Sequence, residues 1–252
     1  MLAKDRIIVA LDVDDPEKAI AIVEQLSEHV GFFKIGLQLI YAIFAGLIAS
    51  PTGELAESNL RIARRLFTLL KGKLFLDGKL HDIPNTTGGS SIEVVRLQPA
   101  MFNLHASADV DAMMDAVARK GNSKVLAVTV LTSLGEDVAH LIYGAPTKAK
   151  VLEFARNAKL AGVDGLVCSP QELTLLKSRR ELKGLVLVTP GIRLAGDSKD
   201  DQARIDTPGN AIKSGADYLV IGRSITKPDK GTMVEAAQRA AADIDAALAV
   251  KA

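Results

Sequence analysis

A short run of mixed charge stands out at residues 75–88, FLDGKLHDIPNTTG. Asp77 and Lys79 are two positions apart on what reads as a strand, so we expect their side chains on the same face. Asp82 follows where the chain turns outward, and Pro84 ends the regular strand. Buried strands seldom carry such charges, so the run is a solvated turn, a metal site or a catalytic cluster.

Lys34, in the run GFFKIGL, brings a second lysine to the same cluster. Neighbouring aspartates favour the ammonium form, which predicts a lysine that donates a proton and is not a Schiff-base nucleophile. The aspartates could instead bind a divalent metal, although two lysines would compete for the same carboxylates. A surface salt-bridge network is the remaining alternative, and the placement on an apolar strand disfavours it.

A second group of candidates lies late in the chain. Arg193 in PGIR, and Gly222 with Arg223 in IGRS, follow the last two expected strands. Backbone N–H groups starting at Gly222, together with the two guanidinium groups, suit a phosphate. The alternative is that each arginine only caps a helix. Taken together, the two runs predict a phosphorylated ligand.

Eight apolar, β-branched runs supply the elements that must position these residues. Near-continuous apolar strands that alternate with helices predict a parallel sheet covered on both faces. Eight such units fit a (β/α)8 TIM barrel forming one domain over residues 1–252, with a doubly wound sheet as the alternative. The candidate residues follow the carboxyl ends of the strands, where barrels carry their active sites. The strands are expected at 6–13, 31–37, 73–80, 101–107, 124–132, 162–169, 185–192 and 216–225.

Other features have a structural and a functional interpretation. Residues 50–72 predict a long amphipathic helix, and GGSS at 88–91 predicts a helix start in preference to a phosphate loop. His81 and His105 are either bases or structural hydrogen-bonding residues. Cys168 lies in an apolar run, which is more typical of core packing than of a nucleophile.

The composition excludes several classes of protein. Hydrophobic residues make up 48% and charged residues 24%, and the net charge is +1. These values predict a soluble globular protein with no bulk affinity for nucleic acid or a membrane. The one cysteine excludes an internal disulfide and fits the cytoplasm. Lys34 and Gln38 interrupt the apolar run 31–50, so we expect a strand followed by a core-facing helix there, and no membrane span.

The block DGKLHDIPNT at 77–86 resembles the signature of the orotidine 5′-phosphate decarboxylase family. Shorter matches run along the whole chain, namely ALD, FKIG, VLTS, PGIR and IGR. The resemblance implies decarboxylation of orotidine 5′-monophosphate to UMP and CO2, the final step of de novo pyrimidine nucleotide synthesis, on a (β/α)8 barrel. It also implies a homodimer that needs neither a metal nor an organic cofactor.

The resemblance further assigns roles to single residues. Lys79 would stabilise the C6 carbanion and then protonate it, with Asp77 lying against the departing carboxylate. Lys34 and Asp82 complete the charge array, and Asp82 and Thr86 would reach into the neighbouring subunit's site. The implied substrate-binding residues are Asp12 and Lys34 for the ribose, Thr132 and Ser133 for the pyrimidine, and Arg193, Gln202, Gly222 and Arg223 for the phosphate, under a closing loop.

The chain departs from the family pattern in places, and two rival functions exist. Gly78 stands where a larger apolar residue is common, Thr87 stands where Val is common, and the segment around 50–60 looks longer than in compact relatives. One rival is a magnesium-dependent barrel acting on sugar phosphates, but such relatives carry an acidic ligand where this chain has Lys34. The other is a barrel that binds a nucleotide without turning it over, which would not require this concentration of charge.

Overall fold

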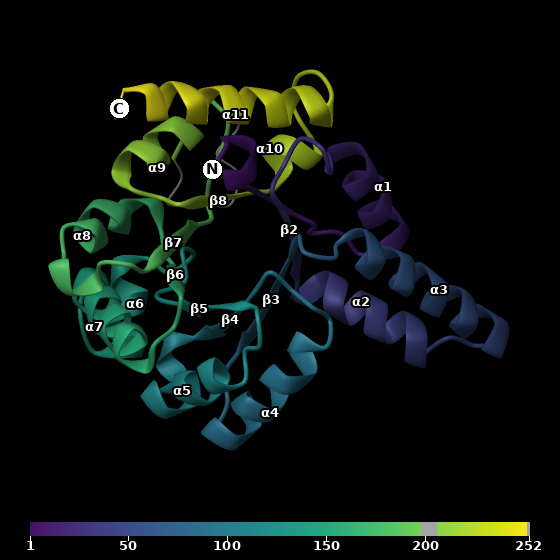
Figure 1. Cartoon of the computed structure of the whole chain (residues 1–252), viewed down its shortest axis with the longest axis horizontal. Coiled ribbons are helices and arrows are strands. Elements are labelled where there is room, and N and C mark those ends of the chain that lie inside the picture. Colours follow the sequence, from purple (N-terminus) through teal and green to yellow (C-terminus); the bar gives the residue numbers. More distant parts are fainter. Residues whose placement is uncertain (198–205, 251–252) are drawn as a thin grey trace.

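Short parallel strands alternate with helices along the chain in a computed structural model, which describes residues 1–197 and 206–250 (Figure 1). The strands close into a barrel in sequence order, and β8 pairs with β1. The predicted (β/α)8 barrel in one domain is therefore confirmed, and the doubly wound alternative is wrong. The strands are β1 (Ile7–Ala10), β2 (Phe32–Gly36), β3 (Leu74–Leu80), β4 (Met101–His105), β5 (Lys124–Val128), β6 (Gly165–Val167), β7 (Val186–Thr189) and β8 (Tyr218–Ile221).

Helices surround the closed sheet. The α-helices are α1 (Pro16–Leu26), α2 (Leu37–Ile48), α3 (Gly53–Leu69), α4 (Pro84–Val95), α5 (Val110–Ala118), α6 (Glu136–Tyr143), α7 (Thr147–Ala161), α8 (Leu173–Lys177), α9 (Pro208–Ser214), α10 (Arg223–Thr226) and α11 (Met233–Ala249). Short 3-10 turns are η1 (Lys4–Arg6), η2 (Ala106–Ala108), η3 (Pro170–Glu172) and η4 (Arg180–Leu182).

The helix expected at 50–72 is present as α3, where the Thr52 hydroxyl accepts from the Leu55 N–H and caps the first turn. The start predicted at 88–91 is wrong, because α4 already begins at Pro84. Proline suits the first helical position, since its φ is fixed near the helical value and that position has no intrahelical N–H partner to lose. The GGSS run therefore lies inside α4.

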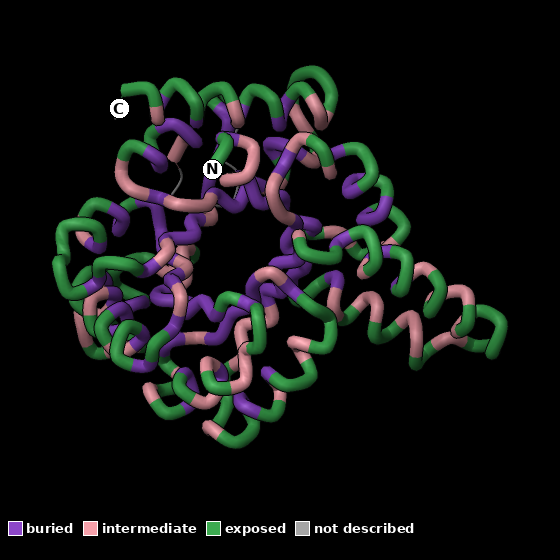
Figure 2. Tube along the Cα trace, viewed as in Figure 1, coloured by how far each residue is buried: buried purple, intermediate pink, exposed green. Residues whose placement is uncertain are grey.

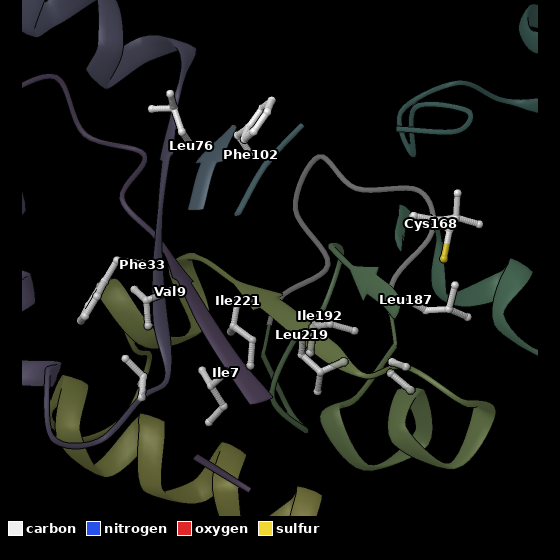
Figure 3. Close-up of a cluster of buried hydrophobic side chains, with 14 of the residues drawn as sticks. Ile7, Val9, Phe33, Leu76, Phe102, Cys168, Leu187, Ile192, Leu219 and Ile221 are labelled. Atoms are coloured by element: carbon white, nitrogen blue, oxygen red, sulfur yellow. The ribbon is translucent and has the colours of Figure 1, made fainter. Parts of the chain in front are cut away.

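The core has two layers, which follow from the period-two alternation along each strand. Ile8 and Phe75 belong to a cluster inside the barrel. Ile7, Val9 and Phe33 belong to the larger cluster that fills the space between the sheet and the helices (Figure 3). In Figure 2 the strands form a central ring of mostly buried residues, within helices whose outer faces are exposed.

The apolar run 31–50 divides into β2 and α2, as expected. None of the helices within residues 1–197 and 206–250 is both long and apolar enough to cross a membrane. The expectation that α2 faces the core is only partly right, because Leu39 is fully buried but Tyr41 and Phe44 are mostly exposed. Helix α2 packs beside α3, and the pair projects away from the ring of the barrel (Figure 1).

Candidate active site

A pocket of about 510 Å³ opens at the carboxyl ends of the strands. Its apolar lining includes Phe75, Val128 and Val220. This is the face of the barrel on which the sequence placed its candidate residues. The sequence-predicted residues that line the pocket are Asp12, Lys34, Asp77, Lys79, Thr132, Arg193, Gly222 and Arg223.

Alternate side chains along each strand point into the barrel, and the charged residues occupy these positions. Phe75 faces the interior and packs in the inner cluster. Asp77 lies two residues further along the same strand and therefore shares its face. Lys34 in the same way follows Phe32, which packs against the inner cluster. The polar residues thus form the layer directly above an apolar plug, at the floor of the pocket.

The charged side chains form a continuous chain of ion pairs. Lys34 Nζ lies 3.0 Å from Asp12 Oδ1 and 3.2 Å from Asp77 Oδ2. Lys79 Nζ lies 2.7 Å from Asp77 Oδ1. Both oxygens of Asp77 therefore contact an ammonium group, and charge alternates in sign along the order Asp12, Lys34, Asp77, Lys79.

Burial and neighbouring charges shift the pKa values of these ion-paired residues in opposite directions. Burial alone would lower the pKa of Lys34, but the carboxylates of Asp77 and Asp12 outweigh it and raise that pKa. Burial alone would raise the pKa of Asp77, but Lys34 and Lys79 outweigh it and lower that pKa. Both groups are therefore held charged at neutral pH, as pairing predicts for a cluster of this composition.

Gly36 explains how a lysine fits on the floor of the pocket. A Cβ atom at position 36 would lie 2.9 Å from Lys34 Nζ and 3.5 Å from Asp12 Oδ1. The missing side chain therefore leaves the space that the ammonium group fills. Within the FKIG run, Lys34 provides the charge and Gly36 provides the space for it.

The backbone at Lys79 departs from regular strand geometry, although its side chain still contacts Asp77. The pairing of β3 with β4 shifts between Leu76 and Leu80, which marks a bulge. Lys79 lies at its centre with φ at +48°, in the left-handed region. The expectation that the two side chains meet is confirmed, but the regular strand geometry expected between them is wrong. The bulge aims the lysine back toward the aspartate.

Asn103 on β4 fixes this bulge, and sequence reasoning missed it. Its Oδ1 accepts from the Lys79 N–H at 2.8 Å, and its Nδ2 donates to Asp77 Oδ1 at 2.7 Å. The side chain is buried. The available signal was a lone amide in the apolar run MFNLH, two positions after Met101 and so on the interior face.

Arg193 and Arg223, which follow β7 and β8, also line the pocket. Arg193 is buried, and its backbone N–H donates to the Asp206 carbonyl at 3.0 Å. Within the described part of the chain, its side-chain Nε has no hydrogen-bond partner. Gly222 and Arg223 follow β8 directly. A buried guanidinium group with an unused donor is suited to bind an anion.

Some predicted residues lie elsewhere. Asp82, Thr86 and Ser133 are exposed and are not part of the pocket wall. The Asp82 carboxylate accepts from the Ile83 N–H at 2.7 Å at the start of α4. Gln202, and with it most of the loop expected to close over the ligand, lies outside the described residues.

Two ambiguous residues have clear surroundings. Cys168 is fully buried, and this burial raises the pKa of its thiol, which suits core packing and not nucleophilic attack (Figure 3). His105 lies at the end of β4 and contacts the Ser107 hydroxyl. In residues 1–197 and 206–250, no three His, Cys, Asp or Glu side chains cluster in a way that could hold a metal ion.

Comparison with known proteins adds an independent line of evidence. Residues 5–240 match the model of the orotidine 5′-phosphate decarboxylase / HUMPS family. An orotidine 5′-phosphate decarboxylase of Heliobacterium modesticaldum is 41% identical over 250 residues, which covers 95% of each chain. One from Rhodopseudomonas palustris is 44% identical over 228 residues, covering 89% of each. The crystal structure of orotidine 5′-phosphate decarboxylase from Lactobacillus acidophilus superimposes with a TM-score of 0.72 at 28% identity, covering 95% of this chain and 98% of that one.

Proposed function

Because the chain belongs to the orotidine 5′-phosphate decarboxylase / HUMPS family, we propose that it decarboxylates orotidine 5′-monophosphate to UMP and CO2. This is the final step of de novo pyrimidine nucleotide synthesis. The observation that carries the proposal is the chain Asp12–Lys34–Asp77–Lys79 at the floor of the pocket. It concentrates fixed charge in a pocket that is also lined by Arg193 and Arg223, whose guanidinium groups suit a phosphate.

Lys79 performs the proton chemistry in this proposal. Loss of CO2 breaks the bond to C6 and leaves the electron pair in the plane of the ring, without a resonance sink. A preorganised cation stabilises that charge at no cost in reorganisation. Lys79 then gives a proton to C6 and regains one from water, so one proton is consumed per turnover.

Asp77 and Lys34 keep Lys79 ready for this step. Asp77 contacts Lys79 at 2.7 Å, which holds the ammonium group in place. Lys34 balances the second oxygen of Asp77 and lets the carboxylate remain ionised in a buried position. Asp77 then also faces the departing carboxylate of the substrate. Asp12 and Lys34 bind the ribose hydroxyls, and Thr132, which lines the pocket, contacts the pyrimidine.

The phosphate is assigned to Arg193, Gln202, Gly222 and Arg223. The buried Arg193 guanidinium, whose Nε has no hydrogen-bond partner among residues 1–197 and 206–250, supports this assignment. A phosphate lies far from the reacting bond, so its binding energy can position the ring over Lys79. TIM barrels frequently bind phosphate in the loops that follow their last two strands, and Arg193, Gly222 and Arg223 follow β7 and β8 in this chain.

Catalysis without a metal or organic cofactor is part of the proposal. Each oxygen of Asp77 contacts a lysine, and these two lysines would repel a divalent cation. The magnesium-dependent relatives that act on sugar phosphates would need an acidic ligand at position 34. The chain has a lysine there, paired with two aspartates.

We also propose a homodimer, working in the cytoplasm, in which Asp82 and Thr86 enter the partner's site. Both residues are exposed on the loop and helix that follow β3. Helix α2 supports a subunit interface, because Tyr41, Phe44 and Ile48 are 65%, 59% and 71% exposed and lie on one stripe. Large apolar side chains in such a stripe favour association with another protein surface.

One experiment tests the function directly. The protein is incubated with orotidine 5′-monophosphate and excess chelator, and the loss of the substrate's ultraviolet absorbance is followed. We expect turnover, which Lys79→Ala lowers by at least about 10⁴-fold because it removes both the cation and the acid. The exposed Lys71→Ala is the matched control and should retain wild-type activity.

Three outcomes would contradict this proposal. Binding without turnover would favour a nucleotide-binding barrel. Turnover only after magnesium is added would favour the relatives that act on sugar phosphates. A folded Lys79→Ala variant that keeps substantial activity would overturn the role given to Lys79, with folding checked by circular dichroism.

A further inference from the structure

Ser107 lies between two imidazoles at the rim of the barrel. Its Oγ is 2.6 Å from His105 Nδ1 and 3.1 Å from His81 Nε2. His105 ends β4, Ser107 lies in the turn η2 that follows it, and His81 comes directly after β3. The hydroxyl therefore bridges two segments that leave neighbouring strands. The three residues are outside the pocket wall described above.

The direction of these hydrogen bonds follows from one unambiguous donor. The Ser107 N–H also donates to His105 Nδ1, at 3.3 Å. A nitrogen that accepts from a backbone amide carries no proton of its own, so the Ser107 hydroxyl must donate to it as well. The hydroxyl oxygen is then free to accept, and the His81 Nε2–H donates to it. The order is His81 to Ser107 to His105.

The surroundings of His105 preserve this order at neutral pH. Burial, with the nearby charges of His81 and Lys79, lowers the pKa of His105 to about 4. The ring also packs edge-on against Phe154 of α7, with the ring centroids 6.3 Å apart. His105 therefore stays neutral and remains an acceptor in a fixed orientation.

The Ser107 hydroxyl links the segments that follow β3 and β4 beyond the point where the pairing of the two strands ends. The last paired residues are Leu80 and Leu104. After them the chain runs through His81 to Asp82, and α4 begins at Pro84. Within this segment the Thr87 hydroxyl donates to the Asp82 carbonyl at 3.0 Å, so the turn is internally tied as well. Ser107 connects that tied turn to the rigid end of β4.

We propose that Ser107 is a positioning residue for the reaction, because it holds the turn that carries Asp82 in the place from which Asp82 enters the partner's site. His105 acts behind it as the acceptor that orients the hydroxyl. Neither residue touches the substrate. This inference rests on the proposed function, since Asp82 matters only in a site built from the charge array.

The test compares three variants on orotidine 5′-monophosphate. Ser107→Ala removes the bridge, and we expect kcat/KM to fall about 10- to 100-fold, mainly in kcat, because catalytic groups tolerate little displacement. UMP affinity should stay within about twofold, since the phosphate wall is untouched. Ser107→Thr keeps the hydroxyl and should restore turnover. Ser178→Ala is the matched control, because Ser178 is also exposed and donates one hydrogen bond, to the Leu175 carbonyl, far from the pocket.

Two readouts do not depend on activity. Only four histidines are present, so imidazole ¹⁵N spectra can be assigned by substitution. They should show neutral His105 with its proton on Nε2, and a proton on His81 Nε2. Amide hydrogen exchange at residues 82–87 should accelerate in Ser107→Ala and return to wild-type rates in Ser107→Thr.

Wild-type kcat/KM in Ser107→Ala, unchanged exchange at residues 82–87, or a proton on His105 Nδ1 would each overturn the inference. A wild-type protein that does not consume the substrate would instead refute the proposed function. In that case the exchange rates still decide whether Ser107 holds the turn.

Discussion

At the scale of single residues, Asn103 joins the two groups that matter most in the pocket. One amide satisfies the Lys79 N–H inside a bulge and one oxygen of the Asp77 carboxylate. The backbone at Lys79 is held at φ +48°, which a non-glycine residue adopts only when its surroundings impose it. Asn103 provides such a constraint through its hydrogen bond to the Lys79 N–H, so we expect it to contribute to both stability and reactivity.

Asn103→Ala should therefore affect two measurements. Loss of the amide leaves the partly buried Lys79 N–H and the buried Asp77 carboxylate each without one hydrogen-bond partner, and we expect the free energy of unfolding in urea to fall by about 1–3 kcal/mol. Misplacement of Lys79 should lower kcat/KM by about 10- to 100-fold. The control is Ser123→Ala, which also removes one buried hydrogen bond, to the Pro99 carbonyl at 2.7 Å. Equal activity in the two variants would show that Asn103 is merely structural.

His105 gives a pH dependence of stability whose sign can be worked out. Its pKa is about 4 in the folded protein against 6.5 for a free imidazole. Between these values the unfolded chain binds more protons, so stability is fully present above pH 6.5 and falls as the pH drops toward 4. Allowing for the partial exposure of the ring, we expect a loss of about 1 kcal/mol between pH 7 and pH 5.

Urea unfolding at both pH values measures this loss directly. His105→Asn should flatten the dependence, because the titrating group is gone. His140→Asn, at an exposed position on α6, should leave the dependence as it is in the wild type. A steep dependence that survives in His105→Asn would assign the effect to other groups.

Much of the site could be predicted from residue type and strand period. The types and spacing of Asp77, Lys79 and Lys34 indicated a cluster of alternating charge, and the structure brings them together. The bulge could not be predicted, because a register shift depends on how a strand pairs with its neighbour. It leaves no periodic pattern in the sequence of the bulged strand itself. Asn103 was missed for the same reason, since its role is defined by a strand distant in sequence.

At the scale of elements, apolar runs located every strand but overestimated most of their lengths. The run 124–132 yields a strand that ends at Val128. Val130 remains buried beyond that point and lines the pocket, so it is apolar without belonging to the strand. Hydrophobicity reports burial, whereas a strand boundary depends on where hydrogen-bonded pairing stops.

The β3 bulge makes a prediction about Gly78. A Cβ atom at this position would have no heavy atom within 4 Å apart from its chain neighbours, and its φ is not in the left-handed region. Gly78→Ala should therefore raise the free energy of unfolding by about 0.4–1 kcal/mol, through a less flexible unfolded chain. It should leave kcat/KM unchanged, because the Cβ contacts none of the charged groups.

Gly165→Ala on β6 provides the contrast. Its Cβ would lie 2.4 Å from the Val186 carbonyl oxygen, so we expect a loss of about 1–3 kcal/mol. Thermal and urea unfolding of both variants would show whether space at the glycine decides the sign. Destabilisation by Gly78→Ala would mean that the bulge requires glycine itself.

At the scale of the whole molecule, the barrel brings opposite ends of the chain to one pocket. Asp12 and Arg223 lie far apart in sequence, yet they line the same cavity because β8 pairs with β1. Closure of the barrel was predictable from eight repeated units, although not from periodicity alone. The sequence did not predict that α2 and α3 project from the barrel. An apolar helix has the same sequence pattern whether it packs against its own barrel or against another protein surface.

Sharing of sites between subunits makes a quantitative prediction. In the proposed dimer, a complete site takes Lys79 from one subunit and Asp82 from the other. Lys79→Ala and Asp82→Ala proteins should each be nearly inactive alone. After mixing and re-equilibration, half of the dimers are mixed and each holds one intact site, so we expect about a quarter of wild-type activity.

The mixing experiment separates a shared site from a self-contained one. Activity that stays at the average of the two inactive proteins would contradict sharing. A mixture of two batches of Lys79→Ala gives the background activity.

Phe44→Glu tests the proposed interface directly. A charge in the exposed stripe of α2 should shift sedimentation toward the monomer if that stripe is buried between subunits. Such a variant should also lose activity as it dissociates, and regain it at higher protein concentration, since a monomer lacks the partner's Asp82. A Phe44→Glu protein that remains dimeric and active would place the interface elsewhere on the barrel.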